Sequence, residues 1–263
     1  MRTSSLLTRI ALLGIVLLLG ACSTLIATPP SAQADDTPSA SAASQAWARV
    51  LQTHVNERGL VDFAALAKAP QDLHTMIRFV AQVPAQKLGD TNTQLAHHIN
   101  AYNALSMFNV IDSGIPQSNA SLTQRYKFFI ARKHTIGGQV MSLYDYENKV
   151  IRAFGESRIH WALNCSALSC PVLPGEPFDA ANLEAQLERE SKKFFASERN
   201  LRVDYPARTV LISEIFKFFP EDFVPSAAPN LITYINRYAS QRIDDSFTVQ
   251  FIPYDWTIAS WRR

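Results

Sequence analysis

Apolar residues recur at helical spacing along most of this chain, and stretches that alternate apolar and polar residues are short. A long helix is predicted over 93–112, because Gly114 and Pro116 then end the pattern. Its apolar side chains point in almost every direction, which is typical of a central, buried helix. The helix also carries Asn100 and Asn103, which lie three residues apart and share one side. Buried amides need hydrogen-bond partners, so both asparagines are candidate site residues.

Strands are predicted to be short and to pair mainly as hairpins. Gly137-Gly138 separates two apolar runs, as in a two-residue hairpin turn, a second hairpin is predicted around 206–208, and a last strand over 247–252. Further helices are predicted over 46–54, 72–83, 179–195, 213–220 and 230–240. The pattern therefore predicts an α+β fold, in which helices pack around a small, mainly antiparallel sheet with one buried helix at the centre.

One predicted helix carries an acid on its apolar face. Ser142 is a candidate N-cap, with Asp145 three residues later in a variant of the capping box. In the helix that follows, Glu147 falls within the apolar stripe. A carboxylate there is costly unless it is paired or protonated. Glu147 is therefore either a structural acid held by a donor, or a catalytic or orienting acid.

The segment 158–171, RIHWALNCSALSCP, concentrates the reactive side chains. Alternating residues over 159–163 predict a half-buried strand, with His160 on its polar face and Cys165 at its end. Imidazole and thiol together are the usual materials of thiolate chemistry. Equally, Cys165 and Cys170 would close a small disulfide loop. The pattern leaves both interpretations open.

The N-terminal residues predict export and attachment to a membrane. Residues 1–21 form a candidate signal peptide, whose apolar run over 10–19 is too short to span a bilayer. Leu19-Gly20-Ala21-Cys22 resembles the lipobox of bacterial lipoproteins, in which the cysteine becomes the acylated N-terminus. Ser23 after Cys22 then implies an outer-membrane lipoprotein facing the periplasm. An ordinary secretory signal is the alternative.

Composition after this segment indicates how the chain is organised. Residues 22–44 hold almost nothing large and apolar, which predicts a disordered tether, and 45–263 is then a single domain. Loss of residues 1–21 removes two arginines and leaves as many basic as acidic residues. A neutral chain without basic runs argues against nucleic acid as a partner. Attachment to the membrane would therefore depend on the lipid anchor.

Several motifs from residue 46 onward match the pattern of a single protein family. They are Val61-Asp62-Phe63, Ile99 to Ala104, Ser142-Leu143 with Glu147, Arg158 to Pro171, Leu211 to Phe216, Glu221-Asp222-Phe223 and Tyr254-Asp255-Trp256. Together they resemble the domain of unknown function 547 family, a name that leaves the activity open. The chain departs from the family pattern at His97-His98, where bulky apolar residues are usual. It also departs at Asn148, where histidine is frequent, so a mechanism that needs an imidazole there is in doubt.

Two functions compete for these residues. The first is a structural or binding module of the cell envelope, whose partner is an envelope protein or a small molecule. The alternative is a thiol-dependent hydrolase or acyltransferase, with Cys165 as nucleophile and His160 as base. In the alternative, Asn100, Asn103 and Glu147 would orient the base or stabilise an oxyanion. One objection is that residues five apart on a straight strand point to opposite faces.

A metal site is a third interpretation of the same residues. His160, Cys165 and Cys170 would supply three ligands and Glu147 a fourth. The spacing H-x₄-C-x₄-C is not a standard zinc pattern. No metal or cofactor is therefore predicted.

Overall fold

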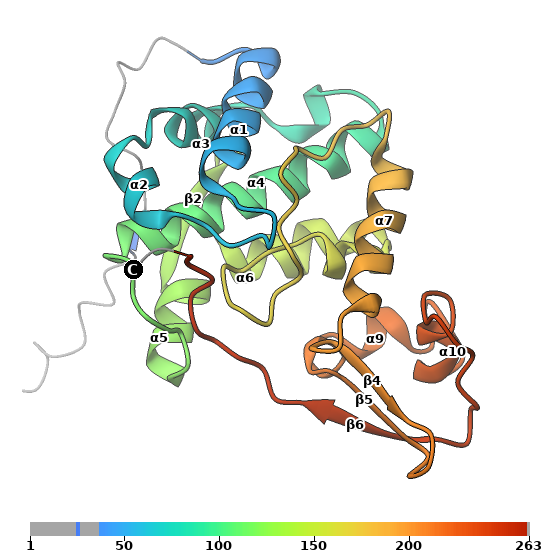
Figure 1. Ribbon diagram of the computed structural model, residues 1–263. Helices are drawn as coiled ribbons and strands as arrows, with labels where there is room; N and C mark the ends of the chain where they lie inside the picture. Colours follow the sequence, from blue (N-terminus) through green and yellow to red (C-terminus); the bar gives the residue numbers. More distant parts are fainter. Residues whose placement is uncertain (1–24, 27–36, 262–263) are drawn as a thin grey trace, which may run out of the picture.

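The structure is a computed structural model that describes residues 25–26 and 37–261 (Figure 1). The predicted signal peptide, Cys22 and most of the predicted tether lie outside the described residues. Helix α1 (Ala40–His54) begins inside the predicted tether, so the domain starts earlier than expected. Ser39 caps this helix by accepting the Ala42 N–H, and Ala43 in its first turn packs into the core, whereas the other residues over 40–44 are exposed.

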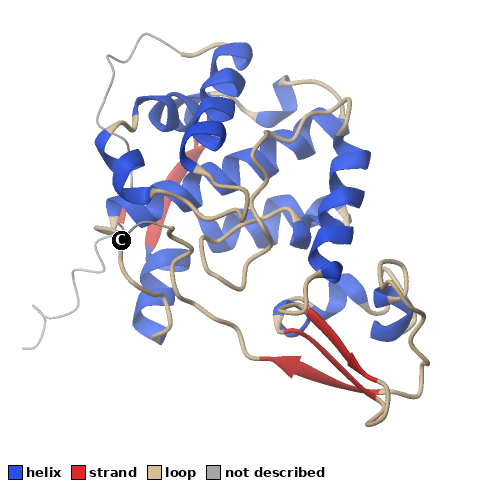
Figure 2. Ribbon diagram, in the orientation of Figure 1, coloured by secondary structure: helices blue, strands red, loops and turns tan. Residues whose placement is uncertain are grey.

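The described chain contains many short helices and two small sheets (Figures 1 and 2). The first half comprises β1 (Leu25–Ile26), α1, α2 (Phe63–Lys68), α3 (Gln71–Gln82), η1 (Ala85–Lys87), α4 (Thr91–Asp112), α5 (Leu122–Tyr126), η2 (Lys127–Ala131), β2 (Arg132–Ile136) and β3 (Gln139–Ser142). The second half comprises α6 (Leu143–Tyr146), η3 (Glu147–Ile151), η4 (Arg152–Phe154), η5 (Ser157–Trp161), α7 (Leu183–Ala196), β4 (Leu201–Asp204), β5 (Thr209–Ser213), α8 (Ile215–Phe218), α9 (Pro220–Phe223), α10 (Leu231–Ile235) and β6 (Thr248–Ile252).

Helix α4 is the central, buried helix that the pattern predicts. Every residue from Leu95 to Val110 is buried, and Asp90 caps the helix by accepting the Thr93 N–H at 2.8 Å. Helices α2 and α3 pack on α4, and α1 packs on α3. Within the described residues, no helix has both the length and the apolarity needed to cross a bilayer.

The α+β class is confirmed, although the strands form two sheets rather than one. Strands β2 and β3 form the hairpin predicted at Gly137-Gly138, where both glycines have positive φ, and β1 adds to β2 in parallel. The predicted hairpin of β4 and β5 forms the second sheet. Strand β6 pairs with β5 in parallel, because the helices α8 to α10 carry the chain back before β6 begins.

The strand predicted over 159–163 is wrong: residues Ser157–Trp161 form the 3₁₀ helix η5. The alternation that suggested a strand has another cause. Ile159 packs into the core around α4, whereas Trp161 packs into a second, aromatic core with Phe194, Phe216 and Phe223. His160 between them is 3% exposed, so this segment has no solvated face.

Three helix boundaries also differ from prediction. Helix α7 begins at Leu183, because Asp179 accepts the Asn182 N–H in a turn and does not cap a helix. The helix predicted over 213–220 is divided at Pro220 into α8 and α9. Helix α10 ends at Ile235, five residues before the predicted end.

The C-terminal segment after β6 runs across the molecule in extended form (Figure 1). The carbonyls of Trp256, Thr257 and Ala259 accept backbone N–H groups from residues 119, 168 and 61. Isolated bridges join the same segment to residues 61, 118 and 167. The segment therefore ties together three parts of the chain that are far apart in sequence.

Candidate functional site

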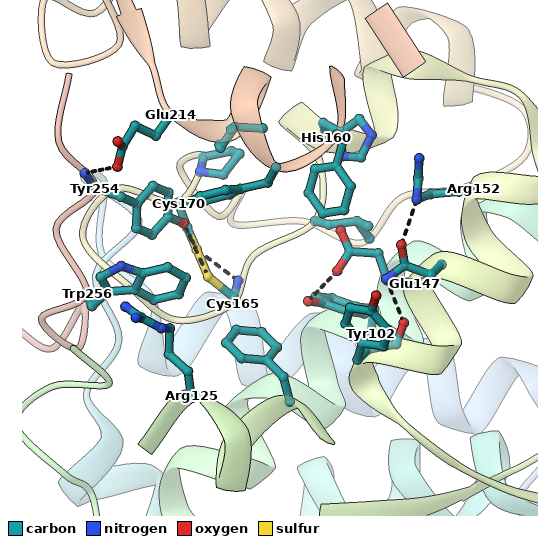
Figure 3. A pocket seen from close by; sticks show the side chains of 18 of the residues that line it. Tyr102, Arg125, Glu147, Arg152, His160, Cys165, Cys170, Glu214, Tyr254 and Trp256 are labelled. Carbon is teal, nitrogen blue, oxygen red and sulfur yellow. Dashed lines mark hydrogen bonds between the residues drawn. A yellow bond between two sulfur atoms is a disulfide. The ribbon is translucent and has the colours of Figure 1, made fainter. Parts of the chain in front are cut away.

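A cavity of about 740 Å³ opens where α4, η3, η5, α8 and the C-terminal segment meet (Figure 3). Its aromatic lining consists of Tyr102, Phe129, Tyr144, Phe218, Phe219, Tyr254 and Trp256. Its charged lining consists of Arg125, Glu147, Arg152, Glu214 and Glu221. His160, Cys165 and Cys170 also line it. The cavity therefore brings together the central helix α4, the helix that carries Glu147 and the segment 158–171.

Glu147 faces this cavity from the start of η3. Ser142 positions it by capping α6, where the Ser142 side chain accepts the Asp145 N–H at 3.0 Å as predicted. The Tyr102 hydroxyl donates to Glu147 Oε2 at 3.0 Å. Burial raises the pKa of Glu147 to about 7, although the Tyr102 hydrogen bond and the Arg152 charge oppose this. The acid therefore exchanges a proton near neutral pH.

The buried His160 belongs to a network with the partly buried Asp222 and Arg152. Its Nε2 lies 2.7 Å from Asp222 Oδ2, and its ring stacks on Phe219 with 4.3 Å between centroids. Arg152 donates to both carboxylate oxygens of Asp222, at 2.6 and 2.7 Å. Burial lowers the pKa of His160, against the pull of Asp222. Burial opposes the ionisation of Asp222, but hydrogen bonds from His160 and Arg152 hold its pKa well below its usual range.

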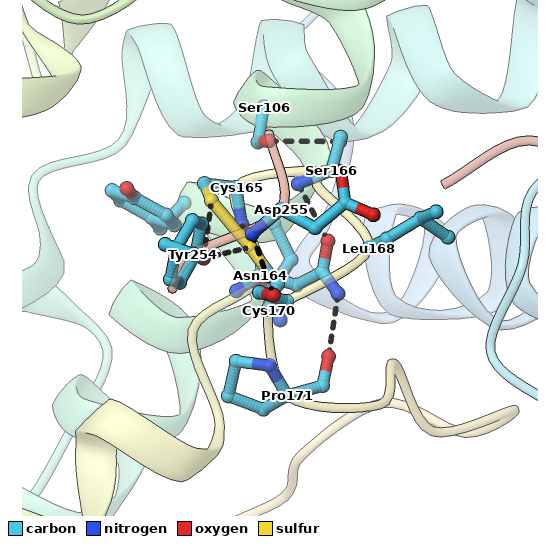
Figure 4. The surroundings of a disulfide bond; sticks show 12 residues. Ser106, Asn164, Cys165, Ser166, Leu168, Cys170, Pro171, Tyr254 and Asp255 are labelled. Atoms are coloured by element: carbon cyan, nitrogen blue, oxygen red, sulfur yellow. Dashed lines mark hydrogen bonds between the residues drawn. A yellow bond between two sulfur atoms is a disulfide. The ribbon is translucent and has the colours of Figure 1, made fainter. Parts of the chain in front are cut away.

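Cys165 and Cys170 are joined by a disulfide that forms part of the cavity wall (Figure 4). The Tyr254 hydroxyl lies 3.3 Å from Cys165 Sγ and 3.1 Å from Cys170 Sγ. Asn164 fixes the loop at both ends, because it accepts the Ser166 N–H and donates to Pro171 O, both at 2.7 Å. A disulfide sulfur has no thiolate to attack with, so the predicted Cys165 nucleophile is absent from this state.

His160 and Cys165 do not pair with each other in this structure. The imidazole Nε2 of His160 is hydrogen-bonded to Asp222, and the sulfur of Cys165 is covalently bonded to that of Cys170. The disulfide also removes the thiolates that a metal would need. Across residues 25–26 and 37–261 no group of three or more histidine, cysteine or acidic side chains is arranged to hold a metal ion.

The two asparagines of α4 hold backbone rather than substrate. Asn103 accepts the Asn164 N–H at 2.7 Å and donates to Ala162 O at 3.0 Å, which positions the chain just before Cys165. Asn100 accepts the Phe178 N–H and donates to Phe178 O. Neither asparagine lines the cavity, so the oxyanion role predicted for them has no place in this site.

Sequence reasoning missed several residues of the site. Tyr102 lies between the two asparagines, and Asp222, Tyr254 and Trp256 belong to motifs that carried the family resemblance, so those motifs were the available signal. Arg125 lies in no such motif. Its guanidinium lies 4.9 Å from the centre of the Trp256 ring, a contact that only the fold creates.

Fold and site together define an α+β domain whose aromatic and charged cavity is bordered by a disulfide. Residues 86–195 match the model of the family described as "Protein of unknown function, DUF547". The match supports the domain family that the motifs indicate, over the segment that holds α4, Glu147, His160 and both cysteines. No curated protein and no solved structure matches the chain.

Proposed function

We propose that this protein is a binding module whose cavity takes a small molecule with a flat apolar part and an acidic group. The observation that carries the proposal is the pairing of Arg125 with Trp256 in the cavity wall. The volume of about 740 Å³ falls within the range of small-molecule sites. Aromatic faces around it suit a flat or ring-shaped group.

Arg125 is the charge that recognises the acidic group. It makes no ion pair with any residue that the structure describes, and its guanidinium rests on the Trp256 ring. Arg152, in contrast, forms ion pairs with Glu221 and Asp222. An arginine held by an aromatic ring keeps its donors directed at an incoming carboxylate or sulfonate.

Glu147 and Tyr102 supply a second polar contact elsewhere in the cavity wall. With a pKa of about 7, Glu147 is present in both forms at neutral pH, and its protonated form can donate a hydrogen bond. The disulfide adds a fixed wall between these groups (Figure 3). The proposal therefore favours binding over the thiol-dependent hydrolase, because the sulfur that would attack is already bonded.

The same proposal places the module in the cell envelope, held by a lipid at Cys22 and facing the periplasm from the outer membrane. Support comes from the Leu19-Gly20-Ala21-Cys22 motif. A disulfide also persists mainly in oxidising compartments such as the periplasm.

The binding proposal is tested with the aromatic sulfonate 1-anilinonaphthalene-8-sulfonate, whose fluorescence rises in apolar sites. We expect one dye per chain, and Arg125→Gln should weaken its affinity roughly tenfold, as loss of one charge-assisted contact does. Arg49→Gln is the matched control, because Arg49 lies on α1 and pairs with the exposed Asp72 outside the cavity. Equal affinity in both variants, or no stoichiometric binding, contradicts the proposal.

A further inference from the structure

Helix α5 and the helical turn η2 that continues it expose a stripe of large apolar side chains. Leu122, Tyr126 and Ile130 are 79%, 53% and 39% exposed. They are four residues apart, so they lie one above the other on a single helical face. Phe128 points the other way and is buried. The stripe is therefore not needed by the core.

Two elements that contact η2 expose further large apolar side chains. Strand β3 and helix α6 both contact η2, and they contribute Val140, 56% exposed, and Tyr144, 52% exposed. We call Leu122, Tyr126, Ile130, Val140 and Tyr144 the α5 face. Five of the eight large apolar residues that the described chain exposes belong to it. A concentration of this kind marks an interaction surface.

The α5 face lies in a basic part of an otherwise balanced chain. Between residues 122 and 149 there are five lysines and arginines and two acids, whereas the whole chain has 25 basic and 23 acidic residues. Lys127 is exposed and forms no ion pair within the described residues, whereas Lys149 at the surface pairs with Asp145 and the buried Arg132 pairs with Asp112. The partner of this face should therefore be both apolar and anionic.

Strand β1 lies beside the end of η2. The backbone of Leu25–Ile26 pairs with Arg132 and Lys133, directly after η2. Cys22 is three residues before Leu25, and three residues span at most about 10 Å of extended chain. A lipid at Cys22 would therefore attach beside the α5 face; this step rests on the lipid anchor proposed above.

We infer that the α5 face lies on the surface of an anionic phospholipid bilayer. Tyrosines and aliphatic side chains settle at the boundary between headgroups and acyl chains. Basic residues beside them add attraction to anionic lipid. Arg125, Phe129 and Tyr144 also line the cavity, so this orientation turns the edge of the cavity toward the membrane.

The test uses the full chain with Tyr126→Trp, in vesicles of phosphatidylcholine and phosphatidylglycerol with brominated acyl chains. Bromine quenches tryptophan only at short range. Tyr205→Trp is the matched control, because Tyr205 is 43% exposed but follows β4 in the second sheet, away from α5 (Figure 1). We expect brominated lipid to quench the added fluorescence of the tryptophan at 126 at least twofold more than that at 205.

Further variants separate the contributions to docking. Leu122→Ser should reduce the quenching at 126 by half or more, and Lys127→Glu should reduce it in anionic vesicles. Both side chains are exposed, so the far-ultraviolet circular dichroism should stay unchanged. Equal quenching at 126 and 205, no association with vesicles, or a face occupied by a protein in a crosslinking experiment would overturn the inference. The mass of the N-terminal peptide reports acylation of Cys22 separately, and dye binding reports the cavity separately.

Discussion

The carboxyl group of Glu147 titrates near neutrality because the fold removes it from water. It is 9% exposed, and Tyr102 is the one hydrogen-bond donor that the described residues give it. The sequence placed this acid correctly on the apolar face of its helix. Its environment could not be predicted, because Tyr102 approaches from α4, 45 residues earlier in the chain.

The raised pKa of Glu147 makes stability depend on pH. The pKa rises from 4.5 to about 7 on folding, so the folded protein holds the proton more tightly than the unfolded chain does. The stabilisation is complete below pH 4.5 and is lost as the pH rises through about 7. At pH 8, Glu147→Gln should therefore unfold with about 2–3 kcal/mol more free energy than the parent chain.

Urea titrations at pH 5 and pH 8 measure this difference. At pH 5 the variant and the parent chain should differ by much less, because both then carry a neutral side chain that accepts from Tyr102. A difference that does not change between the two pH values would show that Glu147 is ionised normally in the folded protein.

Burial changes the protonation of two histidines, His97 and His98. Both stand where the resemblance leads us to expect bulky apolar residues, and both are buried on α4, at 8% and 4% exposed. Burial lowers their pKa values to about 3 and about 4, so both stay neutral; the His97 ring packs edge-on against Phe79, whereas His98 Nδ1 lies 2.7 Å from the Tyr146 hydroxyl. The sequence showed that both depart from the expected pattern but could not show how the fold accommodates them.

At the scale of elements, the sequence correctly predicted two features whose conformation depends on a few neighbouring residues. The Gly137-Gly138 hairpin and the Ser142 cap depend on turn and capping chemistry within a few residues, and both form as predicted. The segment η5 failed because its neighbours decide it. Ile159 and Trp161 belong to different cores, so the alternation of burial does not describe one strand face.

The loop between Cys165 and Cys170 is stabilised by its disulfide. Closing a loop this short should contribute about 2 kcal/mol in the chain-entropy picture. Dithiothreitol should therefore lower the unfolding free energy of the parent chain by about 2 kcal/mol in a urea titration. The double variant Cys165→Ala, Cys170→Ala should start at that lower value and should not respond to dithiothreitol.

Native alkylation with iodoacetamide provides the control for this loop. Without reductant, the peptide that contains Cys165 and Cys170 should remain unmodified, and reduction should add two labels to it. Labelling of either cysteine in the unreduced protein would show that the thiols are free, and it would reopen the thiol-dependent mechanism.

At the scale of the whole molecule, the C-terminal segment joins the two cores. Ile258 packs into the core around α4, while Tyr254 packs against the aromatic core. The resemblance motifs named Tyr254-Asp255-Trp256, but no local pattern could predict that these residues would cross the molecule to contact the disulfide. Long-range pairing of this kind depends on the completed fold, and the wall of the cavity could not be assembled from sequence for that reason.

Shortening the chain tests this joining role. A chain that ends at Pro253 loses the backbone bonds made to residues 61, 119 and 168, each contributing about 1 kcal/mol, and it loses the packing of Ile258. We expect a loss of several kcal/mol, a large share of the stability of a typical domain, and no stoichiometric dye binding. The matched control ends at Trp261. If the chain that ends at Pro253 unfolds at the same temperature as the control, the C-terminal segment does not join the two cores in the way described.

The crossing of the C-terminal segment also has a consequence for biosynthesis. Because Tyr254 and Trp256 are translated well after Glu147, Cys165 and Cys170, a nascent chain whose residues 254–256 are still inside the ribosome has no complete binding chamber. Ligand cannot be captured until residues 254–256 have joined the folded domain, and a chain cut before Tyr254 keeps its acid and both loop cysteines but lacks the chamber.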